Sequence, residues 1–164
     1  MESILEDLVR HVGDNMPELK VVDEDYGQLE FIDQESRDTY PLTFPAVLID
    51  APDVSWSNIR GLSQKGLATV RARLVIDFYD DTHYTSGTTG RIADREKLRR
   101  KLHLLLQGHR VEPDSALIRT SSRFYTFNHG IKVYEATYTL EVTELIEPDA
   151  VVPDKVRLVI RTAQ

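Results

Sequence analysis

The chain has 164 residues, of which 41% are apolar and 29% charged, and its formal net charge is −7. This length suits one domain with a buried core, and the acidic balance argues against nonspecific binding to nucleic acid or to anionic membranes. There is no cysteine, which excludes disulfides, thiol nucleophiles and zinc held by cysteine. The first residues lack the basic and apolar start of a secretion signal, and no apolar run approaches the roughly 20 residues that span a bilayer. We therefore expect the protein to stay where it is made unless an assembly carries it.

The first predicted element is a short amphipathic helix over residues 2–12. Its apolar side chains recur at spacings of three and four, and Gly13 is a natural stop. The irregular, acidic segment 17–41 follows, with strand pieces expected at 19–22 and 28–32. We interpret this segment as an extended excursion from the domain.

Residues 43–50 form a compact apolar run, which predicts a strand with Pro45 at an edge or near its beginning, because proline donates no ladder hydrogen bond. The clearest predicted strand is 67–80. The residues expected on its core side are Leu67, Ala72, Leu74, Ile76 and Phe78. Between these strands, 51–66 has the features of a long hairpin connection and holds the single tryptophan.

A second helix is predicted over 91–107, with leucines on one side, regular turns starting at or just before Asp94, and Gly108 as C-cap. Residues 117–127 and 131–142 alternate around the turn Asn128-His129-Gly130, which predicts a β-hairpin.

The predicted fold class is therefore α+β: an antiparallel sheet with two main helices on one face, in the order α-β-β-β-α-β-β. We expect a single domain over 1–145. Residues 146–164 form a proline-containing linker and an alternating tail strand, KVRLVIRT at 155–162. That strand has two options, since it can return to its own sheet or add to a neighbouring subunit's exposed edge.

Charge is unevenly distributed along the chain. Residues 1–40 carry twelve acidic side chains against three basic ones, whereas 91–103 carry six basic side chains against two acidic ones. The basic run is either a solvated helix face or a surface that meets acid, from nucleic acid or from another copy. Segregation of this kind suits head-to-tail association of identical subunits.

The window DFYDDTHYTSGTTG at 77–90 concentrates chemically active side chains. Asp80, Asp81 and His83 offer metal ligands, but adjacent carboxylates on an extended chain point to opposite sides, and the other histidines lack ligand spacing. Ser86 lies in no GxSxG elbow, and the glycines do not have P-loop spacing. We interpret the window as a strand-to-helix loop, with a metal enzyme or hydrolase as the alternative.

Aromatic side chains cluster in the predicted hairpin, in the run 123–127 and at Tyr134 and Tyr138. Exposed aromatics can stack on the bases of single-stranded nucleic acid, but aromatics are also ordinary strand formers. The nearby Glu135 and Glu141 favour packing within the sheet over base stacking.

Several phrases resemble proteins of phage and prophage tail modules: FPAVLID at 44–50, VSWSN at 54–58, YDDT at 79–82, KLH and LLQG at 101–108, and SRFY at 122–125. Together with the order of elements over 1–145, they are similar to the tail terminator, or tail-completion, proteins of long-tailed phages.

That resemblance implies a small subunit that closes into a ring, commonly a hexamer, at the end of the tail tube and meets the head-side connector. It implies no catalytic activity, no metal or cofactor, no membrane and no specific nucleic acid. The expected location is the virion tail, after assembly in the cytoplasm of the bacterial host. The alternatives are a head–tail adaptor or other minor tail protein, and a non-viral α+β module that binds a peptide or ligand.

The residues expected to contact a neighbouring subunit or partner fall into three groups. Trp56, Ile59 and Leu62 supply apolar area, although Trp56 could equally be a core residue that pins its own loop. Asp81 and His83 lie in the polar window. Arg95, Arg99 and Arg100 lie on the basic helix.

Overall fold

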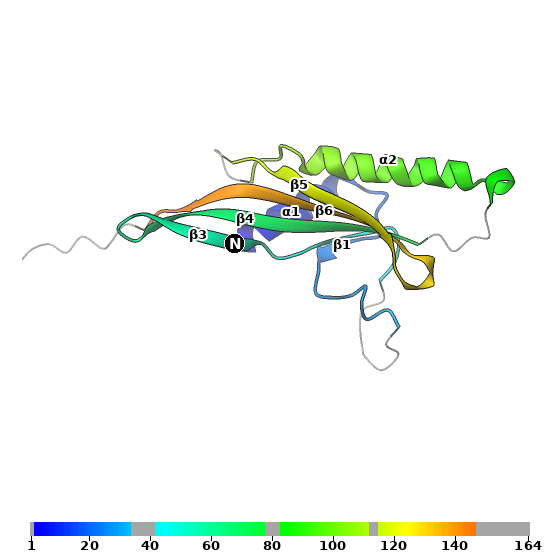
Figure 1. Ribbon diagram of the computed structural model, residues 1–164, viewed down its shortest axis with the longest axis horizontal. Coiled ribbons are helices and arrows are strands. Elements are labelled where there is room, and N and C mark those ends of the chain that lie inside the picture. The colour runs from blue at the N-terminus through cyan, green and yellow to red at the C-terminus, as the bar shows by residue number, and fades with distance from the viewer. Residues whose placement is uncertain (1, 34–41, 78–82, 112–114, 147–164) are drawn as a thin grey trace, which may run out of the picture.

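The computed structural model describes residues 2–33, 42–77, 83–111 and 115–146 (Figure 1). It confirms the α+β class: two α-helices and one six-stranded sheet of order β1-β2-β4-β6-β5, with β3 pairing β4 beside this path. Four strands, one more than expected, precede the second long helix. Every described pairing is antiparallel except β1 with β2, which is parallel. The predicted tail strand at 155–162 lies outside the described residues.

Helix α1 (Glu2–Asn15) is longer than predicted, because Gly13 lies inside it and does not end it. The Met16 amide donates to the Val12 carbonyl at 2.9 Å, and both side chains are buried. This packing outweighs the roughly 1 kcal/mol by which glycine disfavours a helix. The helix therefore ends where its apolar stripe ends.

Strand β1 (Val21–Glu24) replaces the strand predicted at 19–22, and the strand predicted at 28–32 is wrong. There the chain makes a helical turn, in which the Phe31 amide donates to the Gly27 carbonyl at 3.1 Å. The turn inserts Leu29, which is fully buried, against the face of the sheet opposite the helices. The buried Leu29 thus explains why an apolar pattern predicted a strand here, although the segment pairs with no strand.

Strand β2 (Ala46–Ile49) confirms the apolar strand, with Pro45 just before its first residue. All four of its residues are buried, because both faces of the sheet are covered here. Val47 and Ile49 belong to the core on the helix side, and Ala46 and Leu48 to the smaller core on the other side. A continuous apolar run is what burial on both faces requires.

The segment predicted as a long connection is largely a strand. Strands β3 (Asp53–Arg60) and β4 (Ser63–Ile76) form a hairpin that turns at Gly61, where φ is +60°. Most residues of β3 are exposed, so it lacks the apolar alternation that marks a half-buried strand. Leu67 is also a correction, because it is 49% exposed, whereas Ala72, Leu74 and Ile76 are buried as predicted. Phe78 lies outside the described residues.

Helix α2 (Thr88–Leu106) begins six residues before Asp94. Its first turn is the polar run Thr-Thr-Gly, which carries no apolar signal, and it follows Gly87 at φ +106° and the short 3-10 turn η1 (Tyr84–Ser86). At the other end Gly108 has φ +82°, which confirms glycine at the helix terminus.

The predicted hairpin is confirmed as β5 (Ile118–Thr126) and β6 (Lys132–Glu144), joined by a 3-10 turn at Asn128–Gly130. Gly130 has φ +75°, the conformation expected for this glycine.

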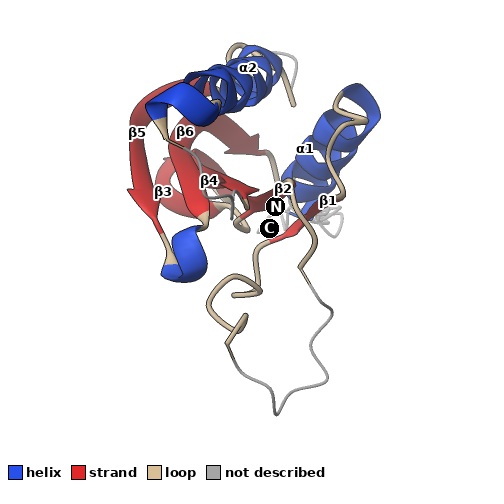
Figure 2. Cartoon of the chain, turned by 90° about the vertical axis from the view of Figure 1, so that its right-hand side faces the viewer, coloured by secondary structure: helices blue, strands red, loops and turns tan. Residues whose placement is uncertain are grey.

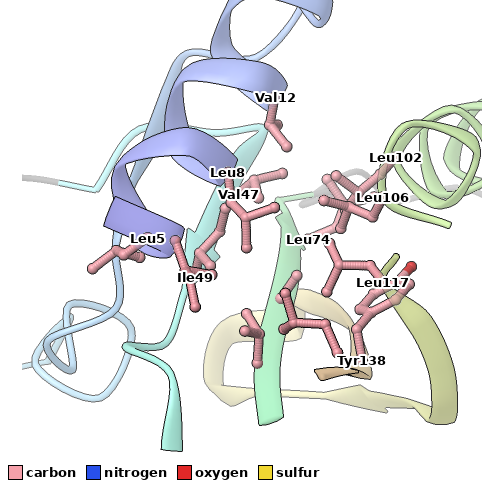
Figure 3. Close-up of a cluster of buried hydrophobic side chains, with 14 of the residues drawn as sticks. Leu5, Leu8, Val12, Val47, Ile49, Leu74, Leu102, Leu106, Leu117 and Tyr138 are labelled. Atoms are coloured by element: carbon pink, nitrogen blue, oxygen red, sulfur yellow. The ribbon is translucent and has the colours of Figure 1, made fainter. Parts of the chain in front are cut away.

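The main core lies between the sheet and the two helices, which both cover the same face (Figures 2 and 3). Figure 3 shows Leu5, Leu8 and Val12 of α1 and Leu102 and Leu106 of α2 converging on the sheet. On the opposite face the buried Arg73 bonds both Asp25 and Glu30, and its Nη2 donates to Glu30 Oε2 at 3.2 Å. This contact holds the loop after β1 against the sheet.

Candidate interaction surface

A groove of about 310 Å³ separates α2 from the sheet. It exists because α2 buries little: only Leu102 and Leu106 of its 19 residues are fully buried. The helix therefore closes on the sheet near its C-terminal end and leaves space beneath its middle. The groove is lined from the helix by Arg99 and His103 and from β5 and β6 by Arg119, Phe124, Tyr134 and Tyr138.

The groove floor combines an aromatic stack with a polar pair. The rings of Phe124 and Tyr134 stack with centroids 4.4 Å apart, and Phe124 stays 50% exposed. His103 Nδ1 lies 3.1 Å from the Tyr138 hydroxyl. Burial, aided by nearby Arg119 and Arg99, lowers the pKa of His103, and burial raises the pKa of Tyr138 to about 12. A neutral imidazole can thus accept the tyrosine hydroxyl proton in a hydrogen bond.

Arg99 and Arg119 border this floor, whereas the side chain of Arg123 lies on the other face of the sheet, and the three arginines differ in their partners. Arg99 Nε donates to Glu96 Oε2 at 2.7 Å, and Arg123 makes two bonds to Glu135 at 2.8 and 2.9 Å. The half-buried Arg119 guanidinium has no hydrogen bond or ion pair within the described part of the chain. Arg119 is thus placed to receive an anionic group from outside.

The position of Arg119 depends on an irregularity in β5. Arg119 pairs with Tyr138 but Ser121 pairs with Thr137, so the register shifts at Thr120. An extra residue in one strand reverses the alternation of side chains. Arg119 therefore faces α2, although the spacing of four to Arg123 would put both on one face.

A second, open groove of about 420 Å³ lies between α1 and β1. Four carboxylates line it, together with Leu5, Val9 and Arg10; the acidic residues are Glu2, Glu6, Asp23 and Glu24. Arg10 is already paired with Glu6 at 2.5 Å. This groove therefore offers apolar contact within an acidic border.

Opposite edges of the sheet consequently carry opposite charge. We define the acidic edge as α1 with β1, which hold six acidic side chains and one arginine. We define the basic edge as α2 with β5, which hold eight basic side chains and two acidic ones. β1 and β5 are the terminal strands of the sheet order, so these two strands lie at opposite edges of the sheet. The helices α1 and α2 are neighbours on one face, where His11 Nε2 lies 3.1 Å from the Leu105 carbonyl oxygen.

The predicted apolar contact residues lie together on the β3–β4 hairpin. Trp56, Ile59 and Leu62 are 38%, 55% and 59% exposed. Trp56 is paired with Gly66, where an added Cβ would lie 2.9 Å from Trp56 Cε3 and 2.5 Å from Val54 Cγ1. The indole thus packs across the glycine of its own hairpin, as a residue that pins its own loop would. It also presents surface to solvent, as a residue that contacts a partner would.

The predicted basic residues lie on α2, but only Arg99 lines the groove. Arg100 is exposed, and Arg95 is half-buried. His83 caps η1: its Nε2 lies 3.2 Å from Thr85 Oγ1, and its amide donates to Ser86 Oγ at 2.7 Å. In Figure 1 the β3–β4 turn and η1 lie at opposite ends of the long axis, so the predicted contacts form two separate sites.

Asp81, and Asp80 of the metal hypothesis, lie outside the described residues. Within the described ranges no three histidine, aspartate or glutamate side chains converge as metal ligands. None of the described helices is both long and apolar enough to span a membrane.

No protein-family model and no curated protein sequence match this chain. Among solved structures, a chain of the virion of a native gene transfer agent (GTA) particle is similar, with 10% sequence identity and a TM-score of 0.44. The match covers 84% of each of the two chains. A likeness of this size transfers no residue role and no function to this chain.

Proposed function

We propose that the chain is a structural subunit of a phage-like tail, specifically a tail terminator or tail-completion protein that forms a ring. The observation that carries the proposal is the opposite charge on the two edges of one sheet. A heterologous contact joins two different patches, so repeating it head to tail builds a closed ring or a filament. The acidic edge of one copy and the basic edge of the next supply such a pair of patches.

Charge guides this association more than it stabilises it. Exposed ion pairs contribute about 0–1 kcal/mol each, and their main effects are on encounter and register. Affinity requires apolar area, which the described surface supplies at Ile59 and Leu62 on the hairpin and at Leu104 on α2. We assign these side chains to contacts with a neighbouring copy or with the tube.

The sequence resemblance supports the remaining parts of the proposal. The partners would be other copies of the chain, in a ring of about six, the tail tube protein and the head-side connector. The role is not enzymatic and uses no cofactor. The subunit would assemble in the bacterial host cytoplasm and belong to the virion tail, and a head–tail adaptor is the neighbouring alternative.

The test is sedimentation velocity over a range of concentrations, with and without purified tail tubes, followed by electron microscopy of the heaviest species. We expect a discrete ring, formed more readily at low salt or on tube ends, because screening weakens exposed charge contacts. A chain that stays monomeric at the highest concentration and ignores tubes would contradict the proposal.

The groove beneath α2 favours a second candidate, a module that binds a ligand or peptide. It joins apolar walls to converging polar groups, the usual composition of a small-ligand site. Arg119 would select a carboxylate or another anion. A thermal-shift screen of aromatic carboxylates against the wild type and Arg119→Gln tests this, since binding predicts a shift in the wild type that the variant loses.

A further inference from the structure

The groove between α1 and β1 lies beside a free strand edge. β1 pairs with β2 alone among the described strands, so its other side has no strand partner there. At its end, the Glu24 amide donates to Asp23 Oδ1 at 2.9 Å and the Glu24 carbonyl accepts from Gln28 Nε2 at 2.6 Å, so an added strand would pair with the residues before Glu24. A strand added there would extend the sheet beneath α1, where Leu5 and Val9 line the groove. Such a position accepts a segment that is apolar on one side.

The charge of this edge restricts what can add to it. Asp23 and Glu24 occupy β1 itself, and Glu2 and Glu6 border the groove from α1. Like charges facing one another across a strand pair are destabilising, which disfavours pairing between two β1 strands. The occupant should therefore be a basic strand with an apolar phase.

One segment of the chain has this composition. Residues 155–162 read KVRLVIRT, with Val156, Leu158 and Ile160 in one phase and three basic residues, with no acidic ones, in the other. These residues lie outside the described part of the chain. No other stretch of the sequence outside the described ranges combines alternation with positive charge: 34–41, 78–82 and 112–114 are short and hold more acidic than basic side chains.

The strand register favours delivery by a neighbouring copy. Glu144, the last residue of β6, pairs with Gln64, whereas Glu24 aligns through Ile49 with Ala72. These positions are about 26 Å apart along β4, and the outer side of β1 lies about 19 Å across the sheet from β6. The direct line from Glu144 to the outer side of β1 is about 32 Å long and crosses β4 and β2. The linker from Glu144 to Lys155 spans at most about 36–40 Å when fully extended. A path around the chain's own sheet is longer than the direct line and would require the full length of the linker. This favours β1 of a neighbouring copy over β1 of the same chain.

β6 lies next to β5, on the basic side of the sheet. In a head-to-tail contact that side faces the acidic edge of the next copy. We propose that residues 155–162 of one copy add as a strand to β1 of its neighbour, with their apolar phase toward Leu5 and Val9. This inference rests on the proposed head-to-tail assembly and names the segment that joins the copies.

Because the chain has no cysteine, disulfide trapping tests the contact cleanly. Two full-length single variants, Asp23→Cys in β1 and Val159→Cys in the tail, are mixed and oxidised. Adjacent strands place Cα atoms within disulfide range. Arg157→Cys serves as a second tail variant, since it shares the phase of residue 159 and covers a register shifted by two. The matched control pairs each tail variant with Leu67→Cys, which lies exposed on β4.

We expect the Asp23→Cys mixture to yield about tenfold more crosslinked dimer than the control, because a docked tail raises the local thiol concentration. Yields equal to the control for both tail positions would overturn the inference. So would a disulfide that forms only within single chains of a double variant, which would show that the tail returns to its own sheet.

Sedimentation of the same samples separates the two proposals. Oligomers without the specific disulfide contradict the tail contact and leave the ring proposal standing. A monomeric wild type contradicts both.

Discussion

The two helices cover the same face of the sheet but use it differently. α1 buries Ile4, Leu5, Leu8 and Val12 within 14 residues, whereas α2 buries Leu102 and Leu106 within 19. A helix that buries a full stripe stabilises the fold, and one that stands away from the sheet leaves its side chains for other contacts. We therefore expect substitutions in α1 to act on stability, and substitutions in α2 to act on the contacts that the proposed assembly requires.

The largest expected effect breaks the packing of α1. Leu8 is 1% exposed in the main core, so Leu8→Ala should lower the free energy of unfolding by about 2–5 kcal/mol. Leu104→Ala on α2, where the side chain is 67% exposed, should change it by less than about 0.5 kcal/mol. Urea denaturation of both variants measures this, and similar losses would contradict the contrast between the helices.

Two glycines extend the comparison to the hairpin. A Cβ at Gly66 would lie 2.5 Å from Val54 Cγ1, so Gly66→Ala should destabilise the fold by about 1–3 kcal/mol. A Cβ at Gly13, inside α1, meets nothing within 4 Å, so Gly13→Ala should stabilise it by about 0.5–1 kcal/mol. Thermal unfolding should give shifts of opposite sign, and a shift of the same sign in both would contradict the packing described.

A smaller effect concerns association through the hairpin. Ile59→Ser with Leu62→Ser should weaken self-association or tube binding by roughly tenfold, since each removes exposed apolar area from a contact. The free energy of unfolding should stay within about 0.5 kcal/mol of the wild type. Tyr84→Ser, beside His83 at the other end of the molecule and 83% exposed, tests the second predicted contact site in parallel. Equal weakening by both variants would argue against a specific role for the hairpin.

The smallest effect is a pH dependence located beneath α2. Burial lowers the pKa of His103 below its ordinary 6.5, so the unfolded chain binds a proton there more readily than the folded chain. This contribution to stability is present above pH 6.5 and is lost as the pH falls toward the pKa of the folded state. His103→Gln should remove that part of the pH dependence.

Glu30 provides a separate contribution at lower pH. Its hydrogen bond from Arg73 lowers its pKa below 4.5, so its stabilising effect is lost only as the pH falls below that value. If His103→Gln left the pH dependence of the free energy of unfolding below pH 6.5 unchanged, the assignment of that dependence to His103 would be contradicted. The pH dependence below pH 4.5, which Glu30 contributes, should be the same in the variant and the wild type and serves as the internal reference.

Alternation predicted the elements that are buried on one side. β6 and the core of β4 follow directly from it, as does the α+β class. β5 is exposed at most positions, and the turn at 128–130 helped to predict it together with β6. The same signal failed where burial differs from that pattern. β3 is exposed on most positions, and Leu29 is buried within a turn. The spacing of apolar residues in the sequence indicates which side chains are buried. It predicts secondary structure only where the burial of an element follows the regular period of a strand or helix.

The groove beneath α2 could not be predicted from the sequence, for two physical reasons. The bulge at Thr120 turns Arg119 toward the helix, and no residue type at that position signals the shift of register. The distance between α2 and the sheet depends on how few of its side chains are buried, which is a tertiary property. The charge segregation along the chain, in contrast, did predict two surfaces of opposite sign.

The central claim is that the acidic and basic edges meet head to tail, and exchanging their charges tests it most directly. One variant carries Glu6→Lys and Glu24→Lys, a second carries Arg99→Glu and Arg119→Glu, and a third carries all four substitutions. Sedimentation velocity at low salt should show assembly of the wild type and of the fourfold variant, with both double variants monomeric. Assembly of either double variant at the wild-type concentration, or failure of the fourfold variant to regain it, would contradict the claim.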